Sequence, residues 1–183
     1  EKSTFSEFKD KITELQSSGM SKMIIDLRDN PGGVLDEACN MADMILPEGI
    51  ITYTETKSGK RTDYNSDAEN LDIPIVILIN ENSASASEVF TGALKDYGKA
   101  TVVGKKSYGK GIVQSVLPFY DGSGMSLTVA KYYTPNGTCI HGIGIEPDVE
   151  VDMPDEYKDM YASMVEHDKD TQLQKAIEII KEK

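Results

Sequence analysis

The most constraining stretch of this sequence is a short apolar run followed at once by a serine-rich turn. Residues 74–79 read Pro-Ile-Val-Ile-Leu-Ile, and residues 80–88 read Asn-Glu-Asn-Ser-Ala-Ser-Ala-Ser-Glu. A continuous apolar run bounded by a turn is typical of a buried strand, and residues 89–97 then have the spacing of an amphipathic helix. The sequence therefore predicts a strand, a tight turn and a helix, as found in α/β proteins.

The three serines of this turn, Ser83, Ser85 and Ser87, support two interpretations. Small hydroxyl side chains at the start of a helix commonly cap its free N–H groups. A serine at the same place could instead react, because a helix N-terminus favours developing negative charge. From this stretch alone, capping is the default interpretation and catalysis is the alternative.

Length and charge narrow the class of protein. At 183 residues the chain is long enough for one domain with a substantial core. Its formal net charge of −12 argues against non-specific binding to DNA or RNA, which requires a basic surface. Much of that charge lies within residues 146–170, which we expect to form a solvated acidic face. The sequence begins at Glu1 without a methionine, so we expect a fragment of a longer protein.

Helical and strand patterns alternate early in the chain, and strands cluster later, which predicts a layered α/β domain. A capping box is expected at residues 4–7, and the polar residues 61–73 are expected to form a loop. Helices are expected within residues 5–15, 35–45, 89–97 and 173–180. Strands are expected at residues 23–28, 50–56, 74–79, 101–103, 112–119, 125–133 and 138–141.

Few residues could supply familiar catalytic or metal chemistry. The chain has only two histidines, and neither His141 nor His167 has the spacing of a Ser-His-Asp triad or a zinc motif. We interpret His141 as a structural hairpin residue and His167 as solvent-facing. Cys39 and Cys139 form no metal-binding cluster, and Cys39 is expected to be a buried thiol.

A serine can also be activated by a neutral lysine. The charged form of such a lysine must be disfavoured by burial or by a nearby cation. Lys110 is the candidate, because it lies at the start of an apolar strand where its stem could be enclosed. Lys105 and Lys106 precede it in the same loop. A solvated loop lysine is the alternative, and it is the default interpretation from composition alone.

Four segments, taken in order, carry a resemblance to a known family. They are residues 23–33 (MIIDLRDNPGG), 80–88 (NENSASASE), 102–114 (VVGKKSYGKGIVQ) and 142–149 (GIGIEPDV). Together they resemble the tail-specific, or C-terminal processing, proteases of the S41 serine peptidase family. The likeness covers roughly residues 5–150. It implies an α/β, layered Clp-protease/crotonase-like core of β-β-α units with mixed sheets and flanking helices.

The resemblance implies that Ser85 is the nucleophile, that Lys110 is the general base and that Gln114 orients the lysine. Four residues of extended strand span roughly 13 Å between α-carbons, so contact between Lys110 and Gln114 requires leaning side chains or a bend at Gly111. Ser83 and Ser87 then become turn residues, one of which could cap the helix.

The resemblance also implies an oxyanion hole, formed by the N–H of Ala86 and the N–H of Gly32 or Gly33. Glycine suits this role because the main chain must approach the substrate closely. The residues expected to support the site are Glu88, Asp96 and Ser107.

The function implied by the resemblance is that of a serine-type endopeptidase that recognises the substrate C-terminus and forms an acyl-enzyme without metal or organic cofactor. Residues 1–183 would form a single S41 catalytic domain, truncated at its N-terminus and lacking the PDZ domain expected in the full-length parent. The expected partner is a protein or peptide substrate, and assembly into a homo-oligomer stays open. The implied location is extracytoplasmic in bacteria, in the periplasm or at the outer face of the cytoplasmic membrane.

Two other functions stay open at this stage. Retinoid-binding proteins of vertebrate photoreceptors resemble the same fold without acting as peptidases, so a non-catalytic module that binds a lipophilic ligand is one alternative. A pure assembly element is another. The intact set of Ser85, Lys110 and Gln114 argues for the peptidase.

Overall fold

The apolar run of the sequence forms β4 (Ile75–Ile79), which is the most deeply buried strand. The computed structural model describes residues 3–183. β4 lies in a parallel sheet of order β1-β4-β5-β8, with β1 (Met23–Asp26), β5 (Ala100–Gly104) and β8 (Val149–Glu150). Parallel strands covered on both faces are apolar throughout, which explains why β4 shows no alternation in the sequence.

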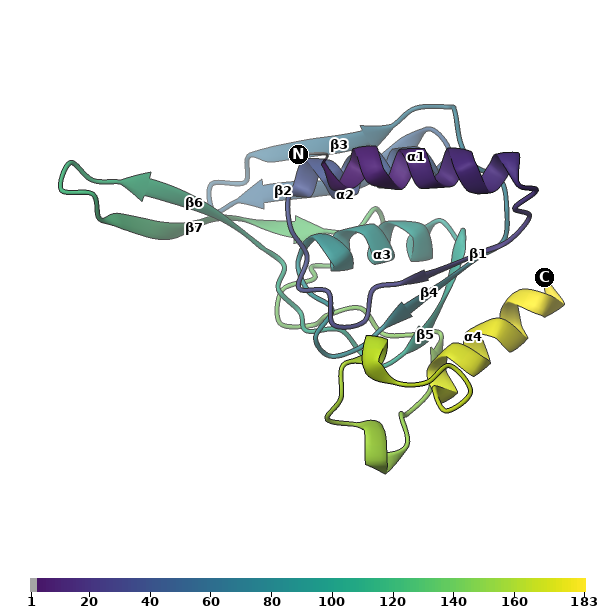
Figure 1. The fold of residues 1–183 in the computed structure, drawn as a ribbon. Coiled ribbons are helices and arrows are strands. Elements are labelled where there is room, and N and C mark those ends of the chain that lie inside the picture. Colours follow the sequence, from purple (N-terminus) through teal and green to yellow (C-terminus); the bar gives the residue numbers. More distant parts are fainter. Residues whose placement is uncertain (1–2) are drawn as a thin grey trace.

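Helices cover both faces of this parallel sheet (Figure 1). Ile75, Ile77 and Ile79 pack into the main core, which includes buried residues of α1 (Thr4–Ser17), α2 (Leu35–Asp43) and α3 (Ala86–Asp96). Val76 and Leu78 pack on the opposite face against α4 (Thr171–Glu182). Two short 3-10 helices, η1 (Asp155–Tyr157) and η2 (Ala162–Met164), lie in the segment before α4.

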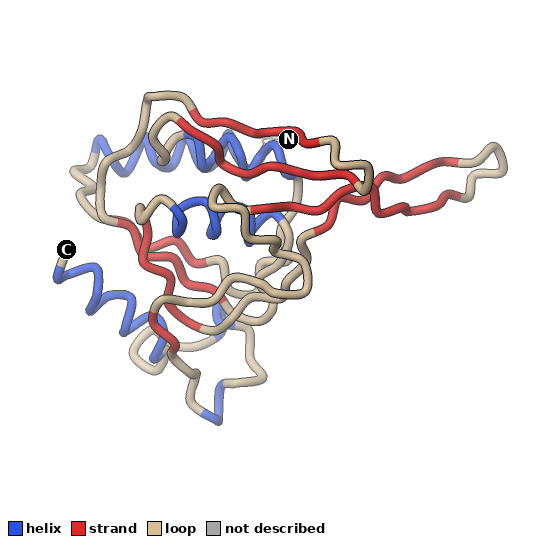
Figure 2. The backbone as a smooth tube through the Cα atoms, turned by 180° about the vertical axis from the view of Figure 1, so that it is seen from behind, coloured by secondary structure: helices blue, strands red, loops and turns tan. Residues whose placement is uncertain are grey.

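A second, antiparallel sheet has the order β3-β2-β7-β6. Its strands are β2 (Gly49–Thr56), β3 (Arg61–Ser66), β6 (Ile112–Pro118) and β7 (Gly124–Tyr133). The outer parts of β6 and β7 extend away from the body of the molecule as a hairpin (Figure 2). The predicted class, α/β with mixed sheets and flanking helices, is confirmed.

Three local expectations were wrong. Residues 61–66 form β3 rather than a loop, because β3 is an edge strand that is mostly exposed and therefore has no apolar pattern. The N-cap of α1 is Ser3, whose hydroxyl accepts the N–H of Ser6, so the predicted capping box begins one residue late. Residues 138–141 form only an isolated bridge, between Cys139 and Tyr133.

The cysteines behave as small side chains within the fold. Cys39 is buried, as predicted, and burial together with the charge of Asp36 raises the pKa of its thiol to about 12. Cys139 is half-buried, and neither cysteine is in a disulfide. Among the described residues, no helix is both long enough and apolar enough to cross a membrane.

Candidate active site

Ser85 occupies a strained position between β4 and α3. Its backbone has φ +57° and ψ −118°, in the region that residues other than glycine rarely adopt. Strain of this kind persists only where surrounding contacts hold it, and it is common at active sites. The residue is half-buried, and its hydroxyl group lies at the start of a helix.

The Glu88 carboxylate joins the serine turn to the lysine loop. Its Oε2 accepts the main-chain N–H groups of Ser85 and Lys110, each at 2.8 Å. Its Oε1 accepts the Ser107 hydroxyl at 2.6 Å and the Gly109 N–H at 2.7 Å. The side chain is only 1% exposed, and four donors compensate for the burial of its charge. Two segments that are distant in the sequence are therefore held by one carboxylate.

The lysine loop is packed tightly against the chain that follows β7. Ser107 exchanges hydrogen bonds with Ile145: its main-chain N–H donates to the Ile145 carbonyl, and its hydroxyl accepts the Ile145 N–H. A side chain at Gly111 would clash with the main chain of Ile140 and His141. These contacts fix the main chain on both sides of Lys110.

The expected enclosure of Lys110 is not present. Its side chain is exposed, and within the described chain no hydrogen bond joins it to Ser85. The charges of the neighbouring lysines are balanced by acids, so they supply no unpaired cation beside Lys110. Lys105 pairs with Glu150 and Asp152, and Lys106 pairs with Glu146.

The glycine turn after β1 lies directly against the serine turn. Gly32 has φ +86°, and a side chain there would come within 2.4 Å of the Ala84 carbonyl oxygen and 2.7 Å of the Ala86 nitrogen. Its own N–H donates to Asn30 Oδ1, which leaves Gly33 as the better of the two predicted glycine donors. The Ala86 N–H opens α3 and so has no acceptor within the helix.

Further hydrogen bonds hold these two turns together. The Ala84 N–H donates to the Asn30 carbonyl at 3.1 Å. The Ser83 hydroxyl donates to the Leu27 carbonyl at 2.7 Å and accepts the Asn80 N–H. Ser83 therefore anchors the serine turn to the end of β1 and does not cap α3, contrary to one of the sequence interpretations.

Two predicted residues lie outside this cluster. Gln114 is exposed on β6, and within the described chain no hydrogen bond joins it to Lys110. The strand register shifts between Val113 and Gln114, so the irregularity is not at Gly111. Asp96 is at the far end of α3, roughly 15 Å from its start, and accepts the Asn136 N–H. Asp96 therefore supports a different turn and does not contact the site.

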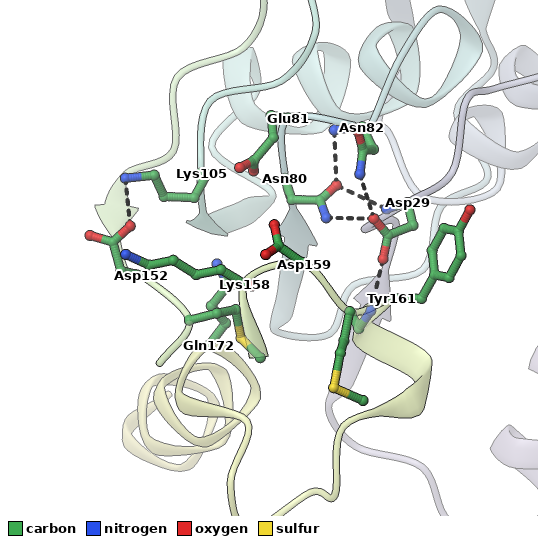
Figure 3. A pocket seen from close by; sticks show the side chains of 13 residues that line it. Asp29, Asn80, Glu81, Asn82, Lys105, Asp152, Lys158, Asp159, Tyr161 and Gln172 are labelled. Carbon is green, nitrogen blue, oxygen red and sulfur yellow. Dashed lines mark hydrogen bonds and ion pairs between the residues drawn. The ribbon is translucent and has the colours of Figure 1, made fainter. Parts of the chain in front are cut away.

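A cavity and a carboxylate network beside the site were not foreseen from the sequence. The cavity of about 170 Å³ adjoins Gly32, Gly33 and Ala86, and its walls include Leu27, Val34, Ala38, Met41 and Phe90. The network centres on the carboxylate of Asp29, which follows β1 of the parallel sheet, and Figure 3 shows its hydrogen bonds. An aspartate ahead of a Pro-Gly-Gly turn was the available signal, but its partners lie more than 50 positions away.

Residues 1–151 match the sequence model of Peptidase family S41. The chain belongs to the S41 peptidase family. Its relatives include proteins named "Probable CtpA-like serine protease" in Staphylococcus aureus strain COL and in Staphylococcus epidermidis. The first is 49% identical over 156 residues, covering 82% of this chain and 31% of the relative. The second is 46% identical over 156 residues, covering 82% and 32%. The S41 chain described here thus spans about a third of the length of these relatives.

Solved structures agree with this membership. The photosystem II D1 C-terminal processing protease is 37% identical and superposes with a TM-score of 0.74, covering 81% of this chain and 40% of that one. A lipoprotein from Streptococcus agalactiae superposes with a TM-score of 0.72 at 18% identity, covering 99% and 63%, and this likeness concerns the fold alone.

Proposed function

We propose that this S41 domain is the catalytic core of a serine endopeptidase in which Ser85 is the nucleophile and Lys110 is the general base. The observation that carries the proposal is the shared carboxylate of Glu88, whose Oε2 accepts the N–H groups of both residues. Because the main-chain N–H groups of both residues donate to one atom, the serine turn and the lysine loop are held side by side, and rotation of the Lys110 side chain can bring its amine toward the Ser85 hydroxyl.

The proposed reaction is acyl transfer. Lys110 becomes neutral once it is turned toward Ser85 and covered by substrate, because burial disfavours its charged form. It then takes the hydroxyl proton of Ser85 as the serine oxygen attacks the peptide carbonyl carbon. The N–H groups of Ala86 and Gly33 donate to the resulting oxyanion, and losing one such donor typically raises the barrier by roughly 3–4 kcal/mol. The C–N bond then breaks, the amine leaves with the proton from Lys110, and water releases the acyl group from Ser85.

Lys110 must turn toward Ser85 for this chemistry. Its side chain is exposed, and its amine is carried on a flexible stem of four carbons. A change of rotamer can therefore move the amine without moving the main chain. Catalytic hydrogen bonds often tighten only once substrate is bound. We propose that Gln114, which follows on β6, holds the turned lysine.

The apolar cavity beside the oxyanion donors suits a substrate side chain. Its volume of about 170 Å³ and its lining by Val34, Met41 and Phe90 favour a small apolar group at the residue preceding the cleaved bond. The solved relative is named for processing a C-terminus, and on that likeness we propose action near substrate C-termini. A PDZ domain in the full-length protein and a location outside the bacterial cytoplasm are further proposals that rest on family likeness.

The test uses the full-length protein that contains this chain, with an unfolded protein such as casein as substrate. Ser85→Ala and Lys110→Ala should each abolish cleavage, whereas Ser123→Ala, at an exposed serine between β6 and β7, should retain it. A fluorophosphonate probe should label the wild type and Ser123→Ala but not Ser85→Ala. Cleavage that survives either of the first two substitutions would show that the assigned dyad is wrong. Retention of a lipophilic ligand without any cleavage would favour a binding module.

A further inference from the structure

Asp29 lies where the chain leaves β1 for the glycine turn, and both oxygens of its carboxylate accept hydrogen bonds. Oδ1 accepts the side-chain amides of Asn80 and Asn82, each at 2.8 Å, and Oδ2 accepts the Ala162 N–H at 2.8 Å (Figure 3). Asp29 thereby joins three parts of the chain: the glycine turn, the serine turn and the segment before α4.

Asp29 and Asn80 hold each other reciprocally. The Asp29 N–H donates to Asn80 Oδ1 at 2.9 Å, while the Asn80 amide donates back to the Asp29 carboxylate. Asn80 Oδ1 also accepts the Asn82 N–H. The pair therefore joins the ends of β1 and β4, from which the two turns of the candidate site begin.

The backbone of Asp29 needs this support. Its φ is +58°, and in the described chain only Asp29 and Ser85 combine a positive φ with a side chain. Such a conformation is unfavourable unless its surroundings impose it. The conformation directs the chain into residues 30–33, where Gly32 meets the Ala84 carbonyl and the Ala86 nitrogen.

The charge of Asp29 agrees with this role. Burial raises the pKa of the carboxyl, but the hydrogen bonds from Asn82, Ala162 and Asn80 and the charge of Arg28 outweigh that effect and leave the pKa below its ordinary value. Asp29 is therefore an ionised acceptor whose oxygens are occupied by donors, which suits it to hold structure rather than to transfer protons.

We propose that Asp29 is a positioning residue that holds the glycine turn, through Asn80 and Asn82, at the distance from the serine turn that the oxyanion donors require. This inference rests on the proposed peptidase function. The third hydrogen bond, from the Ala162 N–H, connects the segment before α4 to the same carboxylate. That segment therefore supports the glycine turn from outside the sheet.

The decisive variants replace or exchange the carboxylate of Asp29 and the amide of Asn80. They use only Asp and Asn, which both tolerate the positive φ of position 29. Asp29→Asn keeps a residue type that accepts positive φ, but its single oxygen cannot serve both the two asparagine amides and Ala162. Asp29→Asn/Asn80→Asp restores a donor and an acceptor across the pair. In the double variant, the amide at position 29 can donate to the carboxylate at position 80 while its oxygen accepts the Ala162 N–H.

Amide hydrogen exchange tests the positioning directly and does not depend on activity. In Asp29→Asn, the Ala84 and Ala162 amides should lose protection about tenfold or more, with the Ile77 amide in β4 unchanged. The double variant should recover most of that protection. Unchanged exchange at both Ala84 and Ala162 in the single variant would overturn the inference, as would the same loss in the single and double variants.

Kinetics of the full-length protein test the consequence for catalysis. Asp29→Asn should lower kcat about tenfold or more with KM changed less than about twofold, because oxyanion donors act chiefly in the transition state. The double variant should regain most of kcat. A rise in KM with kcat intact would contradict the role at the oxyanion turn. If the wild type shows no Ser85-dependent cleavage, the proposed function fails, and hydrogen exchange still decides the role of Asp29.

Discussion

The main-chain N–H groups of Ser85 and Lys110 donate to the same atom, Oε2 of Glu88, each at a distance of 2.8 Å. These residues are 25 positions apart in the sequence. The buried carboxylate therefore fixes the relative placement of the proposed nucleophile and base, while leaving the lysine side chain free to rotate. The following predictions concern this arrangement and the contacts that surround it.

Replacing the carboxylate should loosen both segments. Glu88→Gln retains the shape of the side chain but replaces one carboxylate oxygen with an NH2 group. That group cannot accept the hydrogen bonds that the oxygen accepted, so two donors lose their partner. We expect a loss of roughly 1–3 kcal/mol in unfolding free energy, the cost of leaving buried polar groups unpaired. Probe labelling of Ser85 should fall as well. Urea unfolding measures the first effect, and Glu81→Gln, an exposed glutamate in the same turn, is the matched control.

The two glycines of the turn should differ sharply in their tolerance of alanine. A methyl group at Gly32 would meet the Ala84 oxygen and the Ala86 nitrogen, and the positive φ adds strain. A methyl group at Gly33 would have no heavy atom within 4 Å. Gly32→Ala should therefore reduce kcat by about a hundredfold, comparable with the loss of one oxyanion donor.

Gly33→Ala is the control for the packing of the turn, because Gly33 is in the same turn but has no heavy atom of the fold near its missing side chain. Its free energy of unfolding should stay within about 1 kcal/mol of the wild type, since the added methyl group meets no atom of the fold, whereas Gly32→Ala should lower the free energy of unfolding by more. Equal losses in the two variants would argue that Gly32 does not position the turn through contact with Ala84 and Ala86.

The segment before α4 should depend on the buried ion pair between Arg28 and Asp170. Both side chains are 2% exposed, and Arg28 also binds Asp26 and Gln172. Asp170→Ala leaves the guanidinium group buried with less compensation, so we expect a loss of about 3 kcal/mol in unfolding free energy. Asp155→Ala breaks the exposed pair with Lys158 and should cost less than about 1 kcal/mol. Thermal or urea unfolding distinguishes the two.

Acid should remove the contribution of Asp29 to stability. The pKa of Asp29 in the fold is below its ordinary value of 3.8, so its ionised form is favoured by folding. That contribution is present above the unfolded pKa and is lost as the pH falls through the folded pKa. The stability difference between the wild type and Asp29→Asn should thus be constant near neutral pH and shrink below about pH 4. A difference that grows in acid would contradict the direction of the shift.

Local sequence patterns determined the elements whose residues interact mainly with their own neighbours. The uninterrupted apolar run predicted β4, because a strand covered on both faces has no polar side to reveal. The serine turn and α3 followed from the spacing after it, and the four ordered motifs indicated the S41 family. The polar edge strand β3 was not recognised, because its exposed face carries no apolar signal.

Only the tertiary structure decided which groups share the site. The family resemblance implied that Glu88 supports the site, but it did not say through which partners. Its hydrogen bonds reach Ser107, Gly109 and Lys110, which are about twenty residues away in the sequence. Asp96, predicted alongside it, lies one helix length away. The acids that pair with Lys105 and Lys106 come from beyond residue 145, so their effect on the lysine loop could not be read locally. Hydrogen bonds and ion pairs depend on distance in space, and sequence spacing reports that distance only within a helix, a strand or a turn.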